Sequence, residues 1–264
     1  MAKQALRNIH RLIGEAKKET PHEQSFLADL NTSIEKMNAA SGRVPSRSYK
    51  PSSMQCVRNM YFQVVGATQD DERATAELVG MMQSGSSRHE ELQRVISSMK
   101  DFGVDCIYVD VATYIAENKL DYLTVVSKQG FETKLYHKGL NISFLCDGLL
   151  LYRGVYYILE IKTESMYKWQ TRTGVAEAHI PQGATYALCF GINKVLFVYE
   201  CRDNTSKKSY ILEITDEMKY DVMGKIETSD AYVAKMVPPP KPLDLPKNVC
   251  AYCSYKAECR KAGK

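Results

Sequence analysis

The stretch from Gly139 to Thr163, with the sequence GLNISFLCDGLLLYRGVYYILEIKT, constrains the fold and chemistry of this chain more than any other part of it. Two runs rich in Leu, Ile, Val, Phe and Tyr flank the dipeptide Arg153-Gly154, and a glycine in a two-residue connection is a signal for a β-hairpin. Counting outward from that turn places Asp147 directly opposite Glu160 on the neighbouring strand. The stretch therefore predicts a hairpin that holds two carboxylates face to face.

Two opposed acids on a sheet require compensation. Their Cβ atoms lie roughly 4.5–5.5 Å apart, and like charges at that separation destabilise the sheet. Protonation, a cation or a different register would relieve the pair, and a divalent metal with oxygen ligands is the commonest remedy. Lys162 projects from the same face as Glu160 by the two-residue period of a strand. From the residues alone, a surface acid pair with a lysine counter-ion is the alternative.

Further motifs stand on both sides of the hairpin. Gly85-Ser-Ser-Arg-His89 precedes it, and Glu160-Ile-Lys162 is followed by Gln182-Gly-Ala-Thr-Tyr186. In this order the chain resembles the PD-(D/E)xK nuclease superfamily and, within it, the RecB-like branch. That branch is marked by a helical His, an Asp, an E-x-K and a Q-x-x-x-Y on the following helix. The resemblance implies a restriction-endonuclease-like fold and hydrolysis of phosphodiester bonds.

The resemblance also implies roles for individual residues. The implied ligands of Mg²⁺ or Mn²⁺ are His89, Asp147, Glu160 and the carbonyl of Ile161. Asp147, Glu160 and Lys162 form the implied catalytic set, in which the lysine assists the attacking water while the metal polarises the phosphate. Gln182 and Tyr186, four apart on one helical face, help position the DNA strand and the metal-site residues.

His89 falls in a helix that the spacing of Leu92, Ile96 and Met99 predicts over about 86–100, after a separate helix predicted over 70–83. On such an apolar side a histidine is more often a core or cap residue. Two acids on a sheet beneath that face make it a candidate ligand through a neutral imidazole nitrogen.

Four of the eight cysteines form a second candidate metal site. Cys250-x2-Cys253-x5-Cys259 supplies three thiolates in one short segment, and Cys56 can supply the fourth. On ligand count, zinc and a 4Fe-4S cluster fit equally well. One upstream and three closely spaced downstream cysteines resemble the iron-sulfur nucleases of the RecB-like branch, including the CRISPR-associated exonucleases. That resemblance implies a structural 4Fe-4S cluster, with zinc as the alternative. The other cysteines lie in apolar runs and are predicted core thiols: Cys106, Cys146, Cys189 and Cys201.

The rest of the 264-residue chain predicts a mixed α/β (α+β) fold. Strands are expected over 104–111, 123–136, 194–199 and 210–214, helices over 181–191 and 216–236, and a helix or loop over 110–120. Helices over 3–18 and 23–38 predict an N-terminal helical hairpin, followed by a linker over 41–53. We therefore expect a segment over 1–50 and a nuclease domain over 51–264, with a central mixed sheet flanked by helices and a C-terminal iron-sulfur cysteine loop.

Composition sets broad limits on partners and location. The chain is 44% hydrophobic and 25% charged with a net charge of +4, which permits a polyanionic partner. No signal peptide or long apolar run is visible, so a soluble, cytoplasmic protein without a membrane partner is expected. The N-terminal helices could pack on the domain, bind a protein partner or touch nucleic acid.

Together these features predict a metal-dependent exonuclease acting on single-stranded DNA or DNA ends, with 5′-to-3′ polarity by analogy alone. Recombination, repair, replication and CRISPR adaptation are the processes that fit. The alternative, from a different functional class, is a catalytically silent DNA-binding or assembly module that keeps the nuclease fold.

Overall fold

The computed structural model describes residues 21–40, 46–70, 75–243, 245, 247–251 and 253–263. The chain divides into two compact units, one containing the described residues 21–40 and 75–83 and the other those of 46–70 and 84–263. The helix predicted over 23–38 is confirmed as α2 (Pro21–Ala40), whereas the one predicted over 3–18 lies outside the described residues. The division of the chain at residue 50 stays a prediction.

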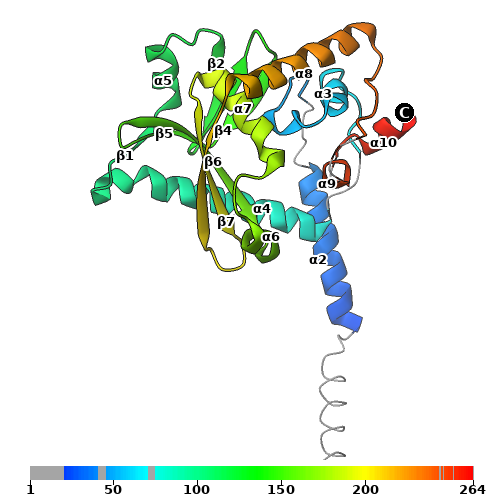
Figure 1. Cartoon of the computed structure of the whole chain (residues 1–264). Coiled ribbons are helices and arrows are strands. Elements are labelled where there is room, and N and C mark those ends of the chain that lie inside the picture. Colours follow the sequence, from blue (N-terminus) through cyan, green and yellow to red (C-terminus); the bar gives the residue numbers. More distant parts are fainter. Residues whose placement is uncertain are drawn as a thin grey trace, which may run out of the picture. The chain divides into compact units, whose positions relative to one another are not determined.

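The larger unit is built on two sheets. A five-stranded sheet has the order β1-β5-β6-β7-β8, and a three-stranded sheet has the order β2-β3-β4. The β6–β7 pair is parallel and the other pairs are antiparallel, so the predicted central mixed sheet is confirmed (Figure 1). The strands are β1 (Cys106–Val109), β2 (Leu123–Gln129), β3 (Glu132–His137), β4 (Ile142–Cys146), β5 (Gly148–Tyr152), β6 (Val155–Glu164), β7 (Lys194–Cys201) and β8 (Lys207–Glu213).

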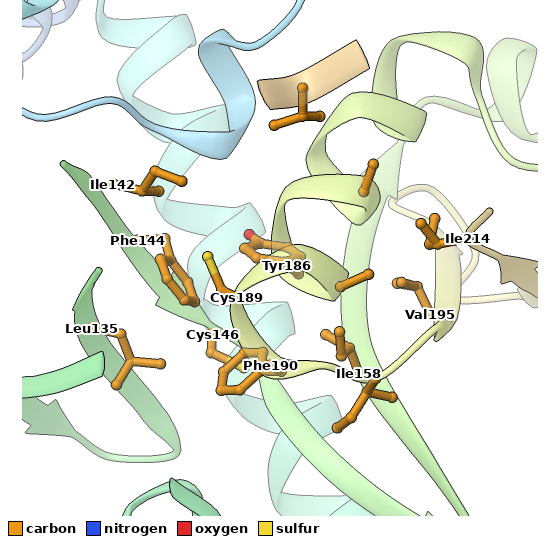
Figure 2. Close-up of a cluster of buried hydrophobic side chains, with 14 of the residues drawn as sticks. Leu135, Ile142, Phe144, Cys146, Ile158, Tyr186, Cys189, Phe190, Val195 and Ile214 are labelled. Carbon is orange, nitrogen blue, oxygen red and sulfur yellow. The ribbon is translucent and has the colours of Figure 1, made fainter. Parts of the chain in front are cut away.

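Helices flank this sheet on both faces. The parallel crossover from β6 to β7 runs through α7 (Ile180–Phe190), whose Phe190 lies with Ile158 of β6 in the main core (Figure 2). Ile226 of α8 (Asp216–Lys235) belongs to the same core. On the opposite face, Leu92 of α4 packs with Leu159. The helices are α3 (Val57–Val64), α4 (Ala76–Ser97), α5 (Val111–Glu117), α6 (Met166–Thr171), α8 (Asp216–Lys235), α9 (Lys247–Ala251) and α10 (Lys256–Lys261), with 3-10 turns η1 (Pro51–Ser53), η2 (Met99–Phe102) and η3 (Glu177–His179). Within the described ranges, no helix is long and apolar enough to cross a membrane.

The predicted hairpin turn and the register from Tyr152 to Gly148 are confirmed, whereas the predicted pairing of Asp147 with Glu160 is not part of the ladder. Arg153 and Gly154 both have positive φ angles, as a type I′ turn requires, and Tyr152 pairs with Val155. However, the first arm is two strands, because β4 belongs to the three-stranded sheet and β5 to the five-stranded one. The chain changes sheet at Asp147, so this residue follows neither ladder. Its position at the junction leaves its carboxylate free to turn toward β6.

Helix α4 is continuous where the sequence predicts two helices, over 70–83 and 86–100, so the predicted break is wrong. Gly85 lies inside the helix. A Cβ there would lie 3.3 Å from the Thr163 hydroxyl oxygen, so the glycine allows a close approach of α4 to β6. Packing therefore offsets the low helix propensity of glycine.

Residues 46–53, the described part of the predicted linker, are packed against the core. Tyr49 is fully buried, forms a parallel bridge with Ile142 of β4, and donates a 2.6 Å hydrogen bond to Asp230 of α8. This segment therefore belongs to the larger unit.

Gly148 is a tight point beside the sheet junction. A methyl group there would lie 2.6 Å from the hydroxyl oxygen of Tyr108, which also donates to the carbonyl of Asp147. We expect Gly148→Ala to lower the free energy of unfolding by about 1–3 kcal/mol, the usual cost of overpacking. Gly224→Ala in α8 is the matched control, because no atom lies within 4 Å of its new Cβ, and it should stabilise by about 0.4–1 kcal/mol. Equal denaturant midpoints for the two variants would contradict this account.

Candidate metal centre and four-cysteine cavity

A cavity of about 480 Å³ opens where the two sheets meet. It brings together five of the predicted site side chains from four parts of the fold and adds a carboxylate that the motifs do not contain. His89 comes from α4, Asp147 from the β4–β5 junction and Glu160 from β6. The acidic, imidazole and α7 groups lining it are His89, Glu132, Asp147, Glu160, Gln182 and Tyr186.

The Asp147 carboxylate is buried and has one backbone partner. Its Oδ2 accepts a 2.7 Å hydrogen bond from the Ile161 backbone amide and lies 3.8 Å from His89 Nδ1. Burial, and then the neighbouring Glu160, raise the pKa of Asp147 well above its usual value, although the Ile161 amide favours the ionised form. The expected role of the Ile161 carbonyl as a metal ligand stays a prediction.

The Glu160 carboxylate is held on one side and unpartnered on the other. Its Oε1 forms a 2.5 Å ion pair with Lys162 Nζ and accepts a 2.7 Å hydrogen bond from Gln182 Nε2. Its Oε2 is buried with no hydrogen-bond partner among the described residues. An orphaned carboxylate oxygen at the wall of an acidic cavity is costly without a cation, so this atom fits a metal-binding role.

Gln182 fixes the relative positions of the groups around Glu160. Its Oε1 accepts from Lys162 Nζ at 3.1 Å, while its Nε2 donates to Glu160 and to the Tyr186 hydroxyl at 2.8 Å. Tyr186 lies one turn further along α7 and is buried against Phe144. The Gln-x-x-x-Tyr spacing thus places the Tyr186 hydroxyl against the amide that holds the Glu160 carboxylate.

Glu132 is the residue that sequence reasoning missed. One ligand atom from each of His89, Glu132 and Asp147 lies within 4.8 Å of the others, and no other such trio occurs among the described residues. Burial and the nearby Glu160 and Glu90 raise the pKa of the Glu132 carboxyl. Glu132 begins β3, in the three-stranded sheet, so its distance from Asp147 depends on how the two sheets pack. No local sequence motif predicts this position.

These residues fit a divalent cation. Three carboxylates and an imidazole are the ligand types that Mn²⁺ and Mg²⁺ sites use, alongside water. Burial, and then the positive charge of Lys162, lower the pKa of His89 to about 4, so its imidazole is neutral and can act as a ligand at neutral pH. A bound cation would also offset the mutual repulsion of the acids.

We expect Glu132→Gln to weaken Mn²⁺ binding at least about tenfold, because the amide removes a charged ligand atom from the trio. Calorimetric titration of Mn²⁺ into metal-free protein measures the change. Glu90→Gln is the matched control, since Glu90 lies close enough to raise the pKa of Glu132 but does not belong to the trio. An equal loss in both variants would assign Glu132 a general electrostatic effect only.

The four predicted cluster cysteines line a second cavity, of about 350 Å³. Cys56 precedes α3, Cys250 lies in α9 and Cys259 in α10. The sulfur of Cys253 accepts hydrogen bonds from Asn59 Nδ2 at 3.4 Å and from the Tyr255 amide at 3.5 Å. These donors favour the thiolate, which is the form that binds metals, although burial, the larger effect, raises the pKa of the Cys253 thiol.

Arg58 closes this cavity beside the cysteines. Its guanidinium is almost completely buried, and its Nη2 donates to the carbonyls of Cys259 at 3.1 Å and Gly263 at 2.8 Å. Its Nε and Nη1 have no partner among the described residues. A buried guanidinium with unused donors fits an anionic group in the cavity, such as a metal bound by four thiolates.

The thiol separation bears on which metal fits. A single zinc with Zn–S bonds of about 2.3 Å holds its sulfurs about 3.8 Å apart. No three of these sulfurs lie within 4.8 Å of one another, because the only trio at that separation in the described part of the chain is the acidic one. In this structure the four thiols therefore line one cavity without meeting the separation that a single bound zinc imposes. The other cysteines are buried, as predicted: Cys106, Cys146, Cys189 and Cys201.

Comparison with known proteins gives distant structural similarities. No protein-family model and no curated protein matches the sequence. The structure is similar to the crystal structure of SSO0001, with 15% identity and a TM-score of 0.46, over 88% of this chain and 96% of that one. It is also similar to LHK-Exo, an alkaline exonuclease from Laribacter hongkongensis, with 17% identity, a TM-score of 0.41 and coverages of 73% and 92%. For the LHK-Exo complex with dAMP the identity is 15% and the TM-score 0.43, over 73% of this chain and 90% of that one.

Proposed function

We propose that this chain is a metal-dependent deoxyribonuclease of the PD-(D/E)xK type that hydrolyses single-stranded DNA from its ends. The observation that carries the proposal is the buried Glu160 carboxylate. One of its oxygens is held by Lys162 and Gln182, and the other has no partner inside an acidic cavity that also contains Asp147. A structural acid pair on a surface would not require a buried oxygen without a partner.

In this proposal the metal is held by His89, Glu132, Asp147 and Glu160. A divalent cation bound there supplies Lewis-acid polarisation of the phosphate and lowers the pKa of a water. The protein supplies the rest. Glu160 holds the Lys162 ammonium at the edge of the cavity, where its remaining N–H groups can donate to the attacking water or to a phosphate oxygen.

Gln182 acts as a positioning residue in the same scheme. By accepting from Lys162 and donating to Glu160, its amide bridges the two partners of this close ion pair and fixes their relative orientation. Tyr186 in turn holds the Gln182 amide through its hydroxyl. The α7 pair therefore sets the direction in which Lys162 presents its proton donors.

We propose the preference for single-stranded DNA and the 5′-to-3′ polarity by analogy, because the motifs occur in the order that marks the RecB-like branch. Lys50 and Lys134 line the candidate metal cavity, so cations stand beside the acidic ligands where a phosphodiester must approach. Recombination, repair, replication and CRISPR adaptation are proposed as the candidate biological processes on the same resemblance.

We also propose that Cys56, Cys250, Cys253 and Cys259 hold a 4Fe-4S cluster that joins the two ends of the nuclease domain. The N–H donors to Cys253 and the buried Arg58 guanidinium beside the cysteines support an anionic metal–thiolate group. Zinc is the alternative, and it requires the sulfurs to move closer together.

The test is degradation of single-stranded DNA blocked at its 5′ or its 3′ end, with Mg²⁺ or Mn²⁺, for wild type and Asp147→Ala. We expect cleavage that disappears in Asp147→Ala and that only one block prevents, which gives the polarity. Asp221→Ala is the matched control, because this aspartate forms an exposed ion pair with Lys225 on α8. Tight DNA binding without metal-dependent cleavage by metal-loaded wild type would favour the silent DNA-binding module instead.

A further inference from the structure

A third cavity, of about 600 Å³, borders the candidate metal centre. The two cavities meet at Lys162, which lines the third one and whose ammonium contacts Glu160 in the first. The third cavity is formed by the end of β6, by α6 and by the segment that follows it. Its principal polar side chains are Thr163, Lys168, Thr171, Arg172, Thr173 and Arg202.

The lining of this cavity is positively charged. The one acidic residue in the described lining, Glu164, is already paired with Arg172, through contacts of 2.5 Å to Oε1 and 2.8 Å to Oε2. Lys168 and Arg202 remain, and neither side chain has a hydrogen bond or ion pair to another described residue. Two uncommitted cations over hydroxyl groups are the recognition chemistry of a phosphate.

The walls are held in place before any ligand binds. The Arg172 guanidinium donates to the carbonyl of Gly174 and lies 4.3 Å from the centre of the Tyr199 ring. Lys208 Nζ donates to the carbonyls of Trp169 and Arg172 at 2.8 and 3.0 Å. A ligand therefore does not have to order this segment, which lowers the entropic cost of binding.

The pKa of His179, which lines the cavity, is affected by the same positive charges. Burial, and then the charges of Lys162 and Arg172, lower the pKa of His179 to about 3, so it is uncharged at neutral pH. Its ring is fixed by a 2.9 Å contact with the Tyr199 hydroxyl. The potential that disfavours a proton on this ring favours an anion in the cavity.

We propose that this cavity binds the terminal nucleotide of a DNA strand, with the end phosphate against Lys168 and Arg202. A volume of about 600 Å³ is in the range of small-ligand sites and accommodates a nucleoside monophosphate. The inference rests on the proposed nuclease function. In that function Lys162 lies between the cavity that binds the end phosphate and the metal centre where the phosphodiester is cut. Such binding makes the enzyme selective for ends that bear a phosphate.

Direct binding tests the site without catalysis. Thymidine 5′-monophosphate, thymidine 3′-monophosphate, inorganic phosphate and thymidine are titrated into protein held metal-free with EDTA. We expect at least one monophosphate to bind, thymidine not to bind, and Lys168→Gln/Arg202→Gln to weaken the binding at least about tenfold, since charged hydrogen bonds are lost. Lys100→Gln/Arg153→Gln removes the same charge from residues that line none of the three cavities, and it should retain wild-type affinity. Inorganic phosphate binding as tightly as the monophosphates would overturn the nucleotide assignment.

Turnover gives a second readout. We expect the Lys168→Gln/Arg202→Gln variant to lower the ratio of kcat/KM for a phosphorylated over a hydroxyl-ended oligonucleotide at least about tenfold, for either the 5′ or the 3′ phosphate. An unchanged ratio at both ends overturns the inference while leaving the nuclease intact. Conversely, monophosphate binding that the variant loses, in a protein that cleaves no DNA, supports the cavity and refutes the proposed function.

Discussion

Lys162→Ala should abolish metal-dependent DNA cleavage, with a fall in kcat of at least about a hundredfold, while the affinity for DNA changes little. The expected loss is large because Lys162 is the cation that contacts Glu160 within the candidate metal centre, at 2.5 Å. Removing one preorganised donor from a reacting centre typically costs roughly 10²–10³ in kcat. Single-turnover cleavage with saturating protein separates this chemical step from DNA binding, which fluorescence anisotropy measures in parallel.

Two controls make this result specific to chemistry. Lys162→Met keeps most of the aliphatic stem and should be as inactive as the alanine variant, because the ammonium group is the functional part. Lys128→Ala removes a lysine whose ammonium pairs with an exposed aspartate, Asp110, and should leave cleavage at the wild-type level. Turnover retained by either Lys162 variant would remove this residue from the proposed mechanism.

Cys253→Ala should release the metal from the cysteine cavity and lower the melting temperature by roughly 5–10 °C, since metal binding and folding free energy are coupled in such sites. Cys253 is the thiol with two N–H donors, from Asn59 and Tyr255, and its side chain packs against Tyr61 and Phe62. Calorimetry of anaerobically purified protein, together with iron, sulfide and zinc analysis, measures both effects.

Cys189→Ala is the matched control for the loss of a thiol. Cys189 is fully buried in the main core and lines none of the cavities described above, so its replacement costs packing alone and should leave the metal content unchanged. A Cys253→Ala protein that keeps its metal and its melting temperature would remove the structural role. Stoichiometric zinc without iron or sulfide in wild type would replace the cluster by its alternative.

The hairpin register was predictable because it depends on short-range rules. A two-residue turn at Arg153-Gly154 fixes the pairing of every residue between it and the strand ends. The break at Asp147 was not predictable in the same way, because the apolar run continues through it and only the second sheet separates β4 from β5. Local sequence thus determined which residues pair, and tertiary structure determined where the pairing stops.

The residues of the candidate metal centre also fall into those placed by local sequence and those placed by tertiary structure. Glu160 and Lys162 share a strand, and Gln182 and Tyr186 share a helical face, so their proximity follows from strand and helix periodicity. Glu132 approaches from another sheet, and nothing in its flanking sequence distinguishes it from an ordinary acid at a turn. The continuity of α4 through Gly85 was missed for a related reason, since the glycine serves a contact with β6 that lies far away in sequence.

The cysteine cavity has a consequence for the order of events during synthesis. Asn59 and Cys253, which touch there, are 194 positions apart, and Arg58 reaches a carbonyl 201 positions away. At a translation rate of about 5–20 residues per second, roughly 10–40 s separate the emergence of these partners from the ribosome. During that interval Cys56 has none of its three proposed partner thiols, so the proposed four-cysteine site can be assembled only after Cys259 has been translated.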